Sequence, residues 1–177
     1  LNEMAGNAID IAMSRGGDQV VVSKYGDELI FFGGKSEAQE KRTKVKVRVM
    51  ADSVLSLIKN SSNVIIMGHT AMDMDALGAC LGMRAICEYC NKSSHIVYDP
   101  KLLERKTKFA LTGAFSREEL ARITISPSDS VDKVRSNTLV IVCDVHRPSL
   151  TMAPKLLEKA AKVMVCLLYT SPSPRDS

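Results

Sequence analysis

Tryptophan is absent from the sequence and aromatic residues make up only 5% of it, so the core must be built from aliphatic side chains and nine methionines. No stretch reaches the roughly 18–20 apolar residues that span a membrane, and no signal peptide opens the chain. The net charge of +4 is too small to indicate nucleic acid binding by itself. With 45% hydrophobic and 25% charged residues, the composition is typical of a soluble globular α/β protein.

The five cysteines form an odd-numbered set that lies inside apolar stretches. This arrangement favours reduced, buried thiols in the cytoplasm over a disulfide framework. Cys87 and Cys90 form a single CxxC motif within a helical pattern, without a second pair elsewhere. We interpret both as small buried apolar residues rather than as metal ligands or a redox pair.

Residues 1–35 are interpreted as the last part of a domain. The chain begins at Leu1 inside a helical pattern over Glu3–Met13, which indicates that it has been cut from a longer protein. Gln19–Ser23 and Glu28–Phe32 then predict two strands of a hairpin. A helix and a hairpin are too small to form a core of their own.

Residues 36–60 contain conflicting patterns. Val45, Val47 and Val49 alternate with basic residues as in a strand, but the wider apolar spacing suits a helix. We favour a helix over Ser36–Lys59, because no turn signal interrupts it. The basic run Lys41–Arg48 is interpreted as a solvated connector face rather than a phosphate or membrane contact.

Residues 61–165 alternate between apolar strands and amphipathic helices, as in a doubly wound, mainly parallel α/β sheet. Gly78 and Gly82 are one helical turn apart and are expected to let a helix approach a strand closely. Ser116 with Glu119 predicts the start of a short helix. The sequence predicts strands at Val64–Met67, His95–Tyr98, Leu139–Cys143 and from Val163, and further helices over Asp73–Cys90, Leu102–Leu111, Ser128–Arg135 and Lys155–Ala161.

Residues 166–177 (CLLYTSPSPRDS) break this pattern with a Ser/Pro/Arg tail that has no periodicity. The string resembles translated sequencing-adapter read-through, and we interpret it as non-native. A natural disordered tail is the alternative.

A cluster of potential metal ligands follows the first strand of the alternating region. His69, Asp73 and Asp75 lie within seven residues, between the apolar strand and the next helix. Ligands of open α/β sheets bind beyond the carboxyl ends of strands, where this loop is expected. Imidazole and carboxylate together suit Mn²⁺, and also Zn²⁺ or Fe²⁺.

Asp144 stands at the end of another apolar strand, Leu139–Cys143. If the two strands are parallel neighbours, Asp144 faces the first cluster, and three carboxylates so close together would repel one another unless cations held them. Structural alternatives exist for each residue singly. Asp73 could be a helix N-cap, Asp75 a first-turn acid and Asp144 a strand-end cap.

These residues define a family resemblance. The motif GHxxxDxDxxGA after an apolar strand, followed by a CDxHxPS loop, resembles the first two motifs of DHH-family phosphoesterases. The chain is most similar to their cyclic-di-AMP phosphodiesterases. The segments AIDIAMSRGGDQVVV and FFGGKSEAQEKRTKVKVRV resemble the end of the degenerate GGDEF domain of those enzymes and its connector.

The resemblance implies two Mn²⁺ ions. His69 and Asp73 would bind one ion, Asp75 the other, and Asp144 would bridge both. A hydroxide held by the cations, rather than a side chain, would be the nucleophile. His146, Arg147 and Ser149 could contact a substrate phosphate, or could simply form a surface loop. The DHH triplet, a later Asp and the DHHA1 subdomain of the family are not in this sequence, so the expected site is incomplete.

The resemblance further implies hydrolysis of cyclic-di-AMP to a linear dinucleotide, without binding of long nucleic acids. The parent protein would be a homodimer tethered to the cell membrane, with this part on the cytoplasmic side. A DHH-type oligonucleotide or polyphosphate hydrolase is one alternative. A non-catalytic module that binds nucleotide or a regulatory partner is another.

Overall fold

The structure of the 177-residue chain is a computed structural model, and it describes residues 19–24, 30–33 and 40–167. The helix expected over Glu3–Met13 and the tail beyond residue 167 lie outside these ranges.

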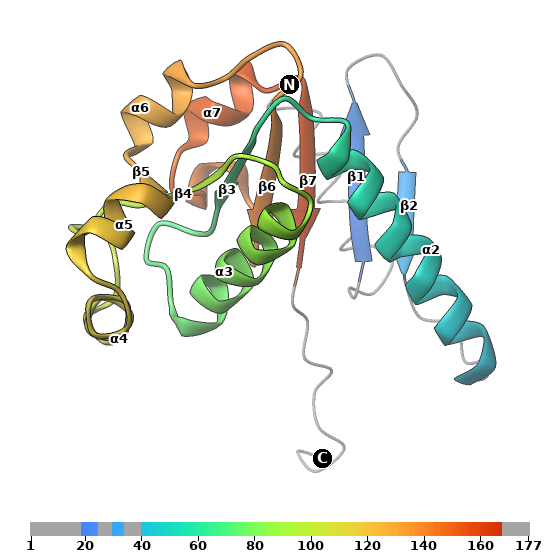
Figure 1. Cartoon of the computed structure of the whole chain (residues 1–177), viewed down its shortest axis with the longest axis horizontal. Helices are drawn as coiled ribbons and strands as arrows, with labels where there is room; N and C mark the ends of the chain where they lie inside the picture. The colour runs from blue at the N-terminus through green and yellow to red at the C-terminus, as the bar shows by residue number, and fades with distance from the viewer. Residues whose placement is uncertain (1–18, 25–29, 34–39, 168–177) are drawn as a thin grey trace.

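A seven-stranded sheet with the order β2-β1-β7-β6-β3-β4-β5 forms the centre of the fold (Figure 1). Strands β3 to β7 are parallel to one another, and β1 pairs antiparallel with both β2 and β7. The predicted α/β fold with a mainly parallel sheet is therefore confirmed. The strands are β1 (Gln19–Lys24), β2 (Ile30–Gly33), β3 (Val64–Met67), β4 (Ser94–Val97), β5 (Thr124–Ile125), β6 (Leu139–Cys143) and β7 (Lys162–Cys166).

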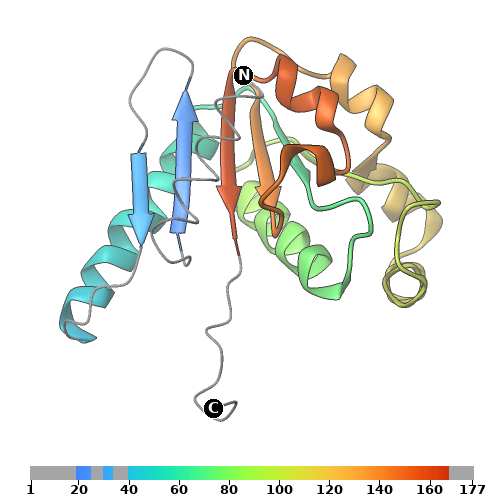
Figure 2. The same ribbon diagram turned by 180° about the vertical axis from the view of Figure 1, so that it is seen from behind.

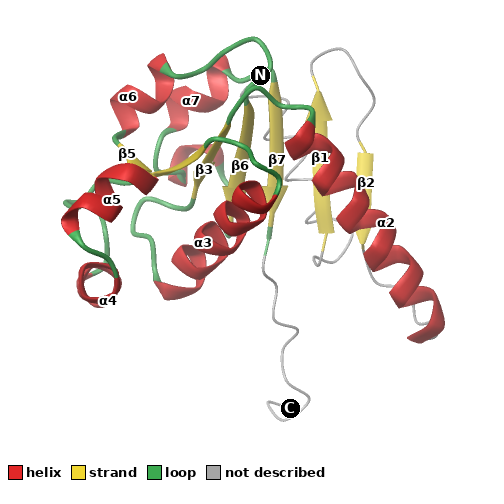
Figure 3. Cartoon of the chain, viewed as in Figure 1, coloured by secondary structure: helices red, strands yellow, loops and turns green. Residues whose placement is uncertain are grey.

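Helices cover both faces of the sheet (Figures 2 and 3). Helices α2 and α3 lie on one face, α6 and α7 lie on the other, and α4 and α5 lie near the β5 edge. This two-sided cover explains why every residue of β3 and β6 is buried, since parallel strands at the centre of a sheet are shielded on both faces. The helices are α2 (Glu40–Lys59), α3 (Met74–Tyr89), α4 (Arg105–Ala114), α5 (Arg117–Ile123), α6 (Pro127–Asp132), the 3₁₀ turn η1 (Pro148–Leu150) and α7 (Pro154–Lys159).

Both ends of α3 have specific caps. The Asp73 carboxylate accepts a hydrogen bond from Ala76 N at 2.9 Å, as an N-cap residue does. At the other end, Asn91 adopts φ 54°, and the backbone N–H groups of Asn91 and Lys92 bond to the carbonyls of Glu88 and Cys87. This is a Schellman motif, in which a residue that tolerates the left-handed region ends the helix.

The expected role of Gly78 and Gly82 is wrong. Both glycines are exposed, and an added Cβ would meet nothing within 4 Å at either position. The face of α3 that packs on the sheet is instead formed by Ala76, Leu77, Cys80 and Cys87. Close packing is achieved by small buried side chains on this face, not by the glycines.

Several predicted boundaries differ from the structure by one to three residues. Helix α4 begins at Arg105 rather than Leu102, because a turn at Asp99 occupies the preceding residues. The Asp99 carboxylate accepts from Lys101 N at 2.9 Å, and its carbonyl accepts from Leu102 N at 3.0 Å. The two-residue strand β5 was not predicted, because a pair of residues is too short to show alternation.

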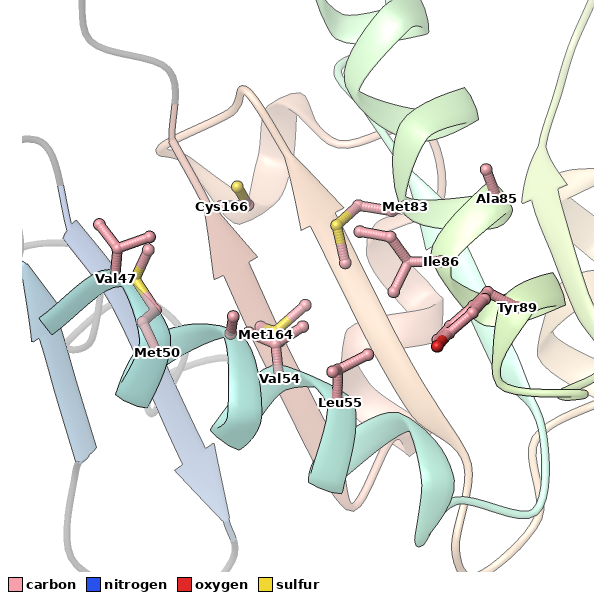
Figure 4. Close-up of a pocket in the computed structure, with 11 residues that line it drawn as sticks. Val47, Met50, Val54, Leu55, Met83, Ala85, Ile86, Tyr89, Met164 and Cys166 are labelled. Carbon is pink, nitrogen blue, oxygen red and sulfur yellow. The ribbon is translucent and has the colours of Figure 1, made fainter. Parts of the chain in front are cut away.

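The conflict over residues 45–49 is resolved in favour of a helix. Helix α2 spans Glu40–Lys59, and Val47 and Val49 are each about half exposed, at 52% and 54%. An apolar groove of about 550 Å³ separates α2 from α3 above β7, with Val54, Met83 and Met164 among its lining residues (Figure 4). No helix in the described part of the chain has the length and apolar character needed to cross a bilayer.

The predicted hairpin is confirmed by the antiparallel pairing of β1 with β2, from Gln19 opposite Gly33 to Val22 opposite Ile30. Unexpectedly, β1 also pairs with β7, so the hairpin extends the same sheet. Strand β7 continues through Cys166, which places this residue in the fold rather than in the tail. The division into domains at residues 35, 60 and 165 stays a prediction.

The capping box of α5 gives a stability prediction. Ser116 Oγ accepts from Glu119 N at 3.2 Å, and Glu119 Oε2 accepts from Ser116 N at 2.8 Å. Replacing Ser116 by Ala should lower the free energy of unfolding by about 1 kcal/mol, the usual worth of an N-cap. Urea unfolding measures this, with Ser136→Ala at an exposed loop position as the control. Equal stability of the two variants would show that the Ser116 cap does not stabilise the fold.

A pH effect follows from the same motif. The hydrogen bonds from the Ser116 backbone and side chain lower the pKa of Glu119 below its ordinary value of 4.5. The stabilisation by the ionised carboxylate is therefore present above about pH 4.5 and lost as the pH falls through the lower, folded-state pKa. The stability difference between the wild type and Glu119→Gln should shrink between pH 6 and pH 3. A stability difference that grows on acidification would contradict a lowered pKa of Glu119 in the folded state.

Candidate metal centre

The parallel pairing of β3 with β6 brings two polar loops together. Val64 lies opposite Leu139, and Met67 lies opposite Val142, so both strands end at the same edge of the sheet. From β3 the chain proceeds to β4 on one side, and from β6 it proceeds to β7 on the other. Such a change of direction is where doubly wound sheets bind ligands.

The loop after β3 holds His69 and Asp73 close to each other. His69 Nε2 lies 3.6 Å from Asp73 Oδ1, and the same carboxylate caps α3. Below the loop, the side chain of Met72 is 99% buried, and a Cβ added at Gly68 would lie only 3.2 Å from Met72 Cε. Glycine at position 68 therefore permits the close packing of this turn.

The loop after β6 is hydrogen-bonded to the loop after β3. The backbone N–H and the hydroxyl of Thr70 both donate to the Leu150 carbonyl at 2.8 Å. Met152 N donates to the Gly68 carbonyl at 2.9 Å, and His69 forms an isolated antiparallel bridge with Thr151. Two segments about 80 residues apart in sequence are thereby fixed side by side.

Asp144 has an unusual backbone conformation. Its φ is 54°, in the left-handed region that non-glycine residues seldom adopt and that Asp and Asn tolerate best. Its N–H donates to the Cys166 carbonyl at 2.8 Å, which holds the start of the loop against β7. Conformations of this kind cluster at ligand-binding sites, where the surrounding structure maintains them.

Three of the four predicted ligands converge. One ligand atom from each of His69, Asp73 and Asp144 lies within 4.8 Å of the other two, and all three residues are half-buried. Two donor atoms that are each about 2.1 Å from one ion lie roughly 3.0–3.4 Å apart at octahedral or tetrahedral angles, so a side-chain rotation that brings the donor atoms closer would allow one ion to contact all three. The imidazole and carboxylate donors fit a divalent transition metal.

Asp75 is not part of this group. It lies exposed in the first turn of α3, where a negative charge also stabilises the positive end of the helix dipole. His146, Arg147 and Ser149 lie in the loop that follows Asp144, with His146 half-buried and Arg147 exposed. The roles of Asp75 as a metal ligand and of His146 and Arg147 as substrate contacts stay predictions.

The thiols around the three-residue group remain protonated at neutral pH. A hydrogen bond with Cys80 and burial raise the pKa of the Cys143 thiol well above its usual range. Burial, with smaller effects of Cys143 and Asp144, raises the pKa of Cys166 to about 11. All five cysteines are free, and burial also raises the pKa of Cys87 to about 11. Cys80, Cys87 and Cys143 are buried as predicted, whereas Cys90 and Cys166 are only partly buried.

Sequence reasoning missed the residues that position the group. Thr70, Met72 and Thr151 fix the two loops, but none is a metal ligand and none belongs to a local pattern. Only the pairing of β3 with β6 brings them into contact.

Comparisons of the sequence with known proteins show the family of this chain. Residues 63–167 match the DHH family, N-terminal domain. Over 165 residues the chain is 35% identical to cyclic-di-AMP phosphodiesterase GdpP of Bacillus subtilis (strain 168) and 32% identical to cyclic-di-AMP phosphodiesterase PdeA of Listeria monocytogenes serotype 1/2a (strain 10403S). It is 30% identical over 162 residues to a membrane protein–large ribosomal subunit bL9 fusion protein of Onion yellows phytoplasma (strain OY-M).

These matches cover 93%, 93% and 90% of the chain, but only 25%, 25% and 19% of the relatives. The chain thus spans about a quarter or less of the length of these proteins. The family match covers more than half of the chain and includes His69, Asp73 and Asp144. The chain belongs to the DHH family, and its residues 63–167 match the N-terminal domain of that family.

Proposed function

We propose that this chain is part of a metal-dependent phosphodiesterase that hydrolyses cyclic-di-AMP to a linear dinucleotide. The observation that supports this most directly is the convergence of His69, Asp73 and Asp144 where the sheet changes direction. Two relatives with the same DHH domain bear the name cyclic-di-AMP phosphodiesterase. The names of these relatives and the metal-compatible group of His69, Asp73 and Asp144 therefore support the same reaction, the hydrolysis of a phosphodiester.

The proposed cofactor is a pair of Mn²⁺ ions. His69 and Asp73 would hold the first ion, Asp75 would contribute to the second, and Asp144 would lie between them. Divalent cations at such a site lower the pKa of bound water and neutralise charge on a phosphate. The exposed position of Asp75 leaves room for the further ligands that the second ion needs, which this chain does not contain.

The protein has two tasks in this proposal, to position the metal ligands and to contact the phosphate. The loop bonds of Thr70 and Met152 keep the imidazole and the carboxylates at fixed separations before substrate arrives. Hydrolysis forms a bond from water oxygen to phosphorus and breaks a bond from phosphorus to a ribose oxygen. Arg147 and His146 are proposed to contact the phosphate oxygens, where a cation stabilises the charge of the transition state.

The parent protein is proposed to be a membrane-tethered homodimer with this domain on the cytoplasmic side. The resemblance of residues 1–35 to the end of a degenerate GGDEF domain supports a signalling enzyme with several domains. The length of the relatives and the words "membrane protein" in the name of the phytoplasma relative are consistent with this arrangement. The cyclic dinucleotide is the proposed partner, and long nucleic acids are not.

Metal binding can be tested on the 177-residue chain itself. Mn²⁺ titration followed by electron paramagnetic resonance should show a bound ion. Asp73→Asn and Asp144→Asn should each weaken binding at least about tenfold, because even outer-shell partners of metal sites are worth about 10–100-fold. Asn is preferred to Ala at position 144 because Asn tolerates φ 54°.

The matched control is Asp132→Asn, an exposed residue at the end of α6. Circular dichroism establishes that each variant is folded. Equal Mn²⁺ affinity of all three variants and the wild type would refute the proposed metal group.

Activity requires the complete gene product. With Mn²⁺ it should convert cyclic-di-AMP to the linear dinucleotide, as measured by ion-exchange chromatography, and Asp144→Asn should lower the rate by roughly 100-fold or more. The isolated 177-residue chain should show almost no turnover, because it lacks the further ligands that the second ion needs in addition to Asp75 and Asp144. An unchanged rate in Asp144→Asn would refute the mechanism. Faster cleavage of linear oligonucleotides or polyphosphate than of cyclic-di-AMP would show that one of these is the substrate instead.

A further inference from the structure

A polar pocket lies at the opposite end of the sheet from the group of His69, Asp73 and Asp144. It has a volume of about 440 Å³, within the range of small-molecule sites, and lies between the end of α3, the start of β4 and α5. The metal group lies beyond the carboxyl ends of β3 and β6, whereas this pocket includes Ser94, the first residue of β4. The two sites therefore share no residue.

The pocket is rich in positive charge. Arg84, Lys92 and Arg122 line it, and Glu88 is the only acidic residue among its lining. Glu88 accepts from Arg84 Nη1 at 3.1 Å, which neutralises one cation and leaves two in excess. His95 also lines the pocket, and Ser and Asn residues complete the wall.

Donors in the pocket outnumber acceptors. Lys92 Nζ donates to the Ser61 carbonyl at 2.8 Å, which anchors the ammonium group and leaves its other two N–H bonds for a ligand. Two carbonyls in the last turn of α3, those of Glu88 and Cys87, are already bonded to the N–H groups of Asn91 and Lys92. The end of the helix thus presents few acceptors to the cavity.

One donor is both buried and unpaired. Arg84 Nε has no hydrogen-bond partner among the described residues and almost no solvent contact. A buried donor without a partner is costly, because it loses its bonds to water without replacement. An acceptor entering the pocket beside Arg84 could satisfy it.

We infer that this pocket binds a small phosphate-type oxyanion, such as inorganic phosphate or pyrophosphate. Arg84 and Arg122 provide guanidinium donors of the kind that bind phosphate oxygens, and Lys92 adds a point charge. The lining contains no Phe, Tyr or Trp side chain on which a base could stack, and His95 is its single aromatic ring, which favours a small inorganic anion over a nucleotide.

His95 provides a spectroscopic reporter. Burial, and then the positive charges of Lys133 and Arg84, lower the pKa of His95 below its ordinary value of 6.5. The charged groups around it in the pocket are Arg84, Lys92, Arg122 and Glu88. A bound dianion would favour the protonated imidazole, so ligand binding should raise the pKa of His95.

The test uses the 177-residue chain, freed of metal by EDTA, at constant ionic strength. Titration with phosphate and with pyrophosphate, followed by calorimetry, should give saturable binding, and nuclear magnetic resonance should show a higher His95 pKa in the bound state. The double variant Arg84→Gln/Arg122→Gln should bind pyrophosphate at least about tenfold more weakly, since it loses two charge-assisted contacts.

Two controls make the result specific. Arg105→Gln removes an exposed cation on α4, outside the pocket, and should bind as the wild type does. Asp144→Asn alters the metal group and should also leave anion binding unchanged, so the outcome is independent of the proposed function. Any of three results would overturn the inference. These are equally weak pyrophosphate binding by Arg105→Gln, a His95 pKa that does not change on binding, and tenfold tighter binding of adenosine monophosphate than of pyrophosphate.

Discussion

The parallel pairing of β3 with β6 is the constraint on which the convergence of His69, Asp73 and Asp144 depends. The two strands are separated by about 70 residues of sequence, yet their register places Met67 opposite Val142. Because parallel strands end at one edge, the residues that follow them, His69 and Asp144, must meet there. The fully apolar composition of both strands makes the pairing stable, since each strand is buried on both faces.

The loops at this edge are fixed before any ligand binds. Thr70, Met152 and the His69–Thr151 bridge join the two loops, and the Asp144 N–H bonds to β7. The left-handed backbone of Asp144 is stabilised by these neighbouring contacts. Neutral, buried thiols beneath the site add no competing charge, so the carboxylates and the imidazole define its chemistry.

Helix α3 connects two chemically opposite regions of the molecule. At its amino end, Asp73 caps the helix and belongs to the metal group, and Asp75 follows in the first turn. Near its carboxyl end, Arg84 and Lys92 line the cationic pocket. Acidic residues at the first turn are favoured, because the positive end of the helix dipole lies there. An anion beyond the last turn is disfavoured, because the negative end of the dipole lies there. The Schellman bonds of Asn91 and Lys92 reduce this conflict by occupying two of the carbonyls in the last turn.

The sequence by itself determined the features that depend on neighbours along the chain. The strand–loop–helix unit around His69 and Asp73, the β6 strand ending before Asp144 and the Ser116 capping box follow from apolar periodicity and capping chemistry. The metal-compatible residue types were also visible, because a histidine and several carboxylates follow two apolar strands in the sequence.

Only the tertiary structure decided which of these residues meet. It grouped His69 and Asp73 with Asp144, left Asp75 exposed on the helix surface, and added the β1 hairpin to the β7 edge. Strand β5 and the cationic pocket likewise depend on long-range packing. These outcomes follow from strand register and from hydrogen bonds between distant loops, and neither leaves a periodic signal in the sequence.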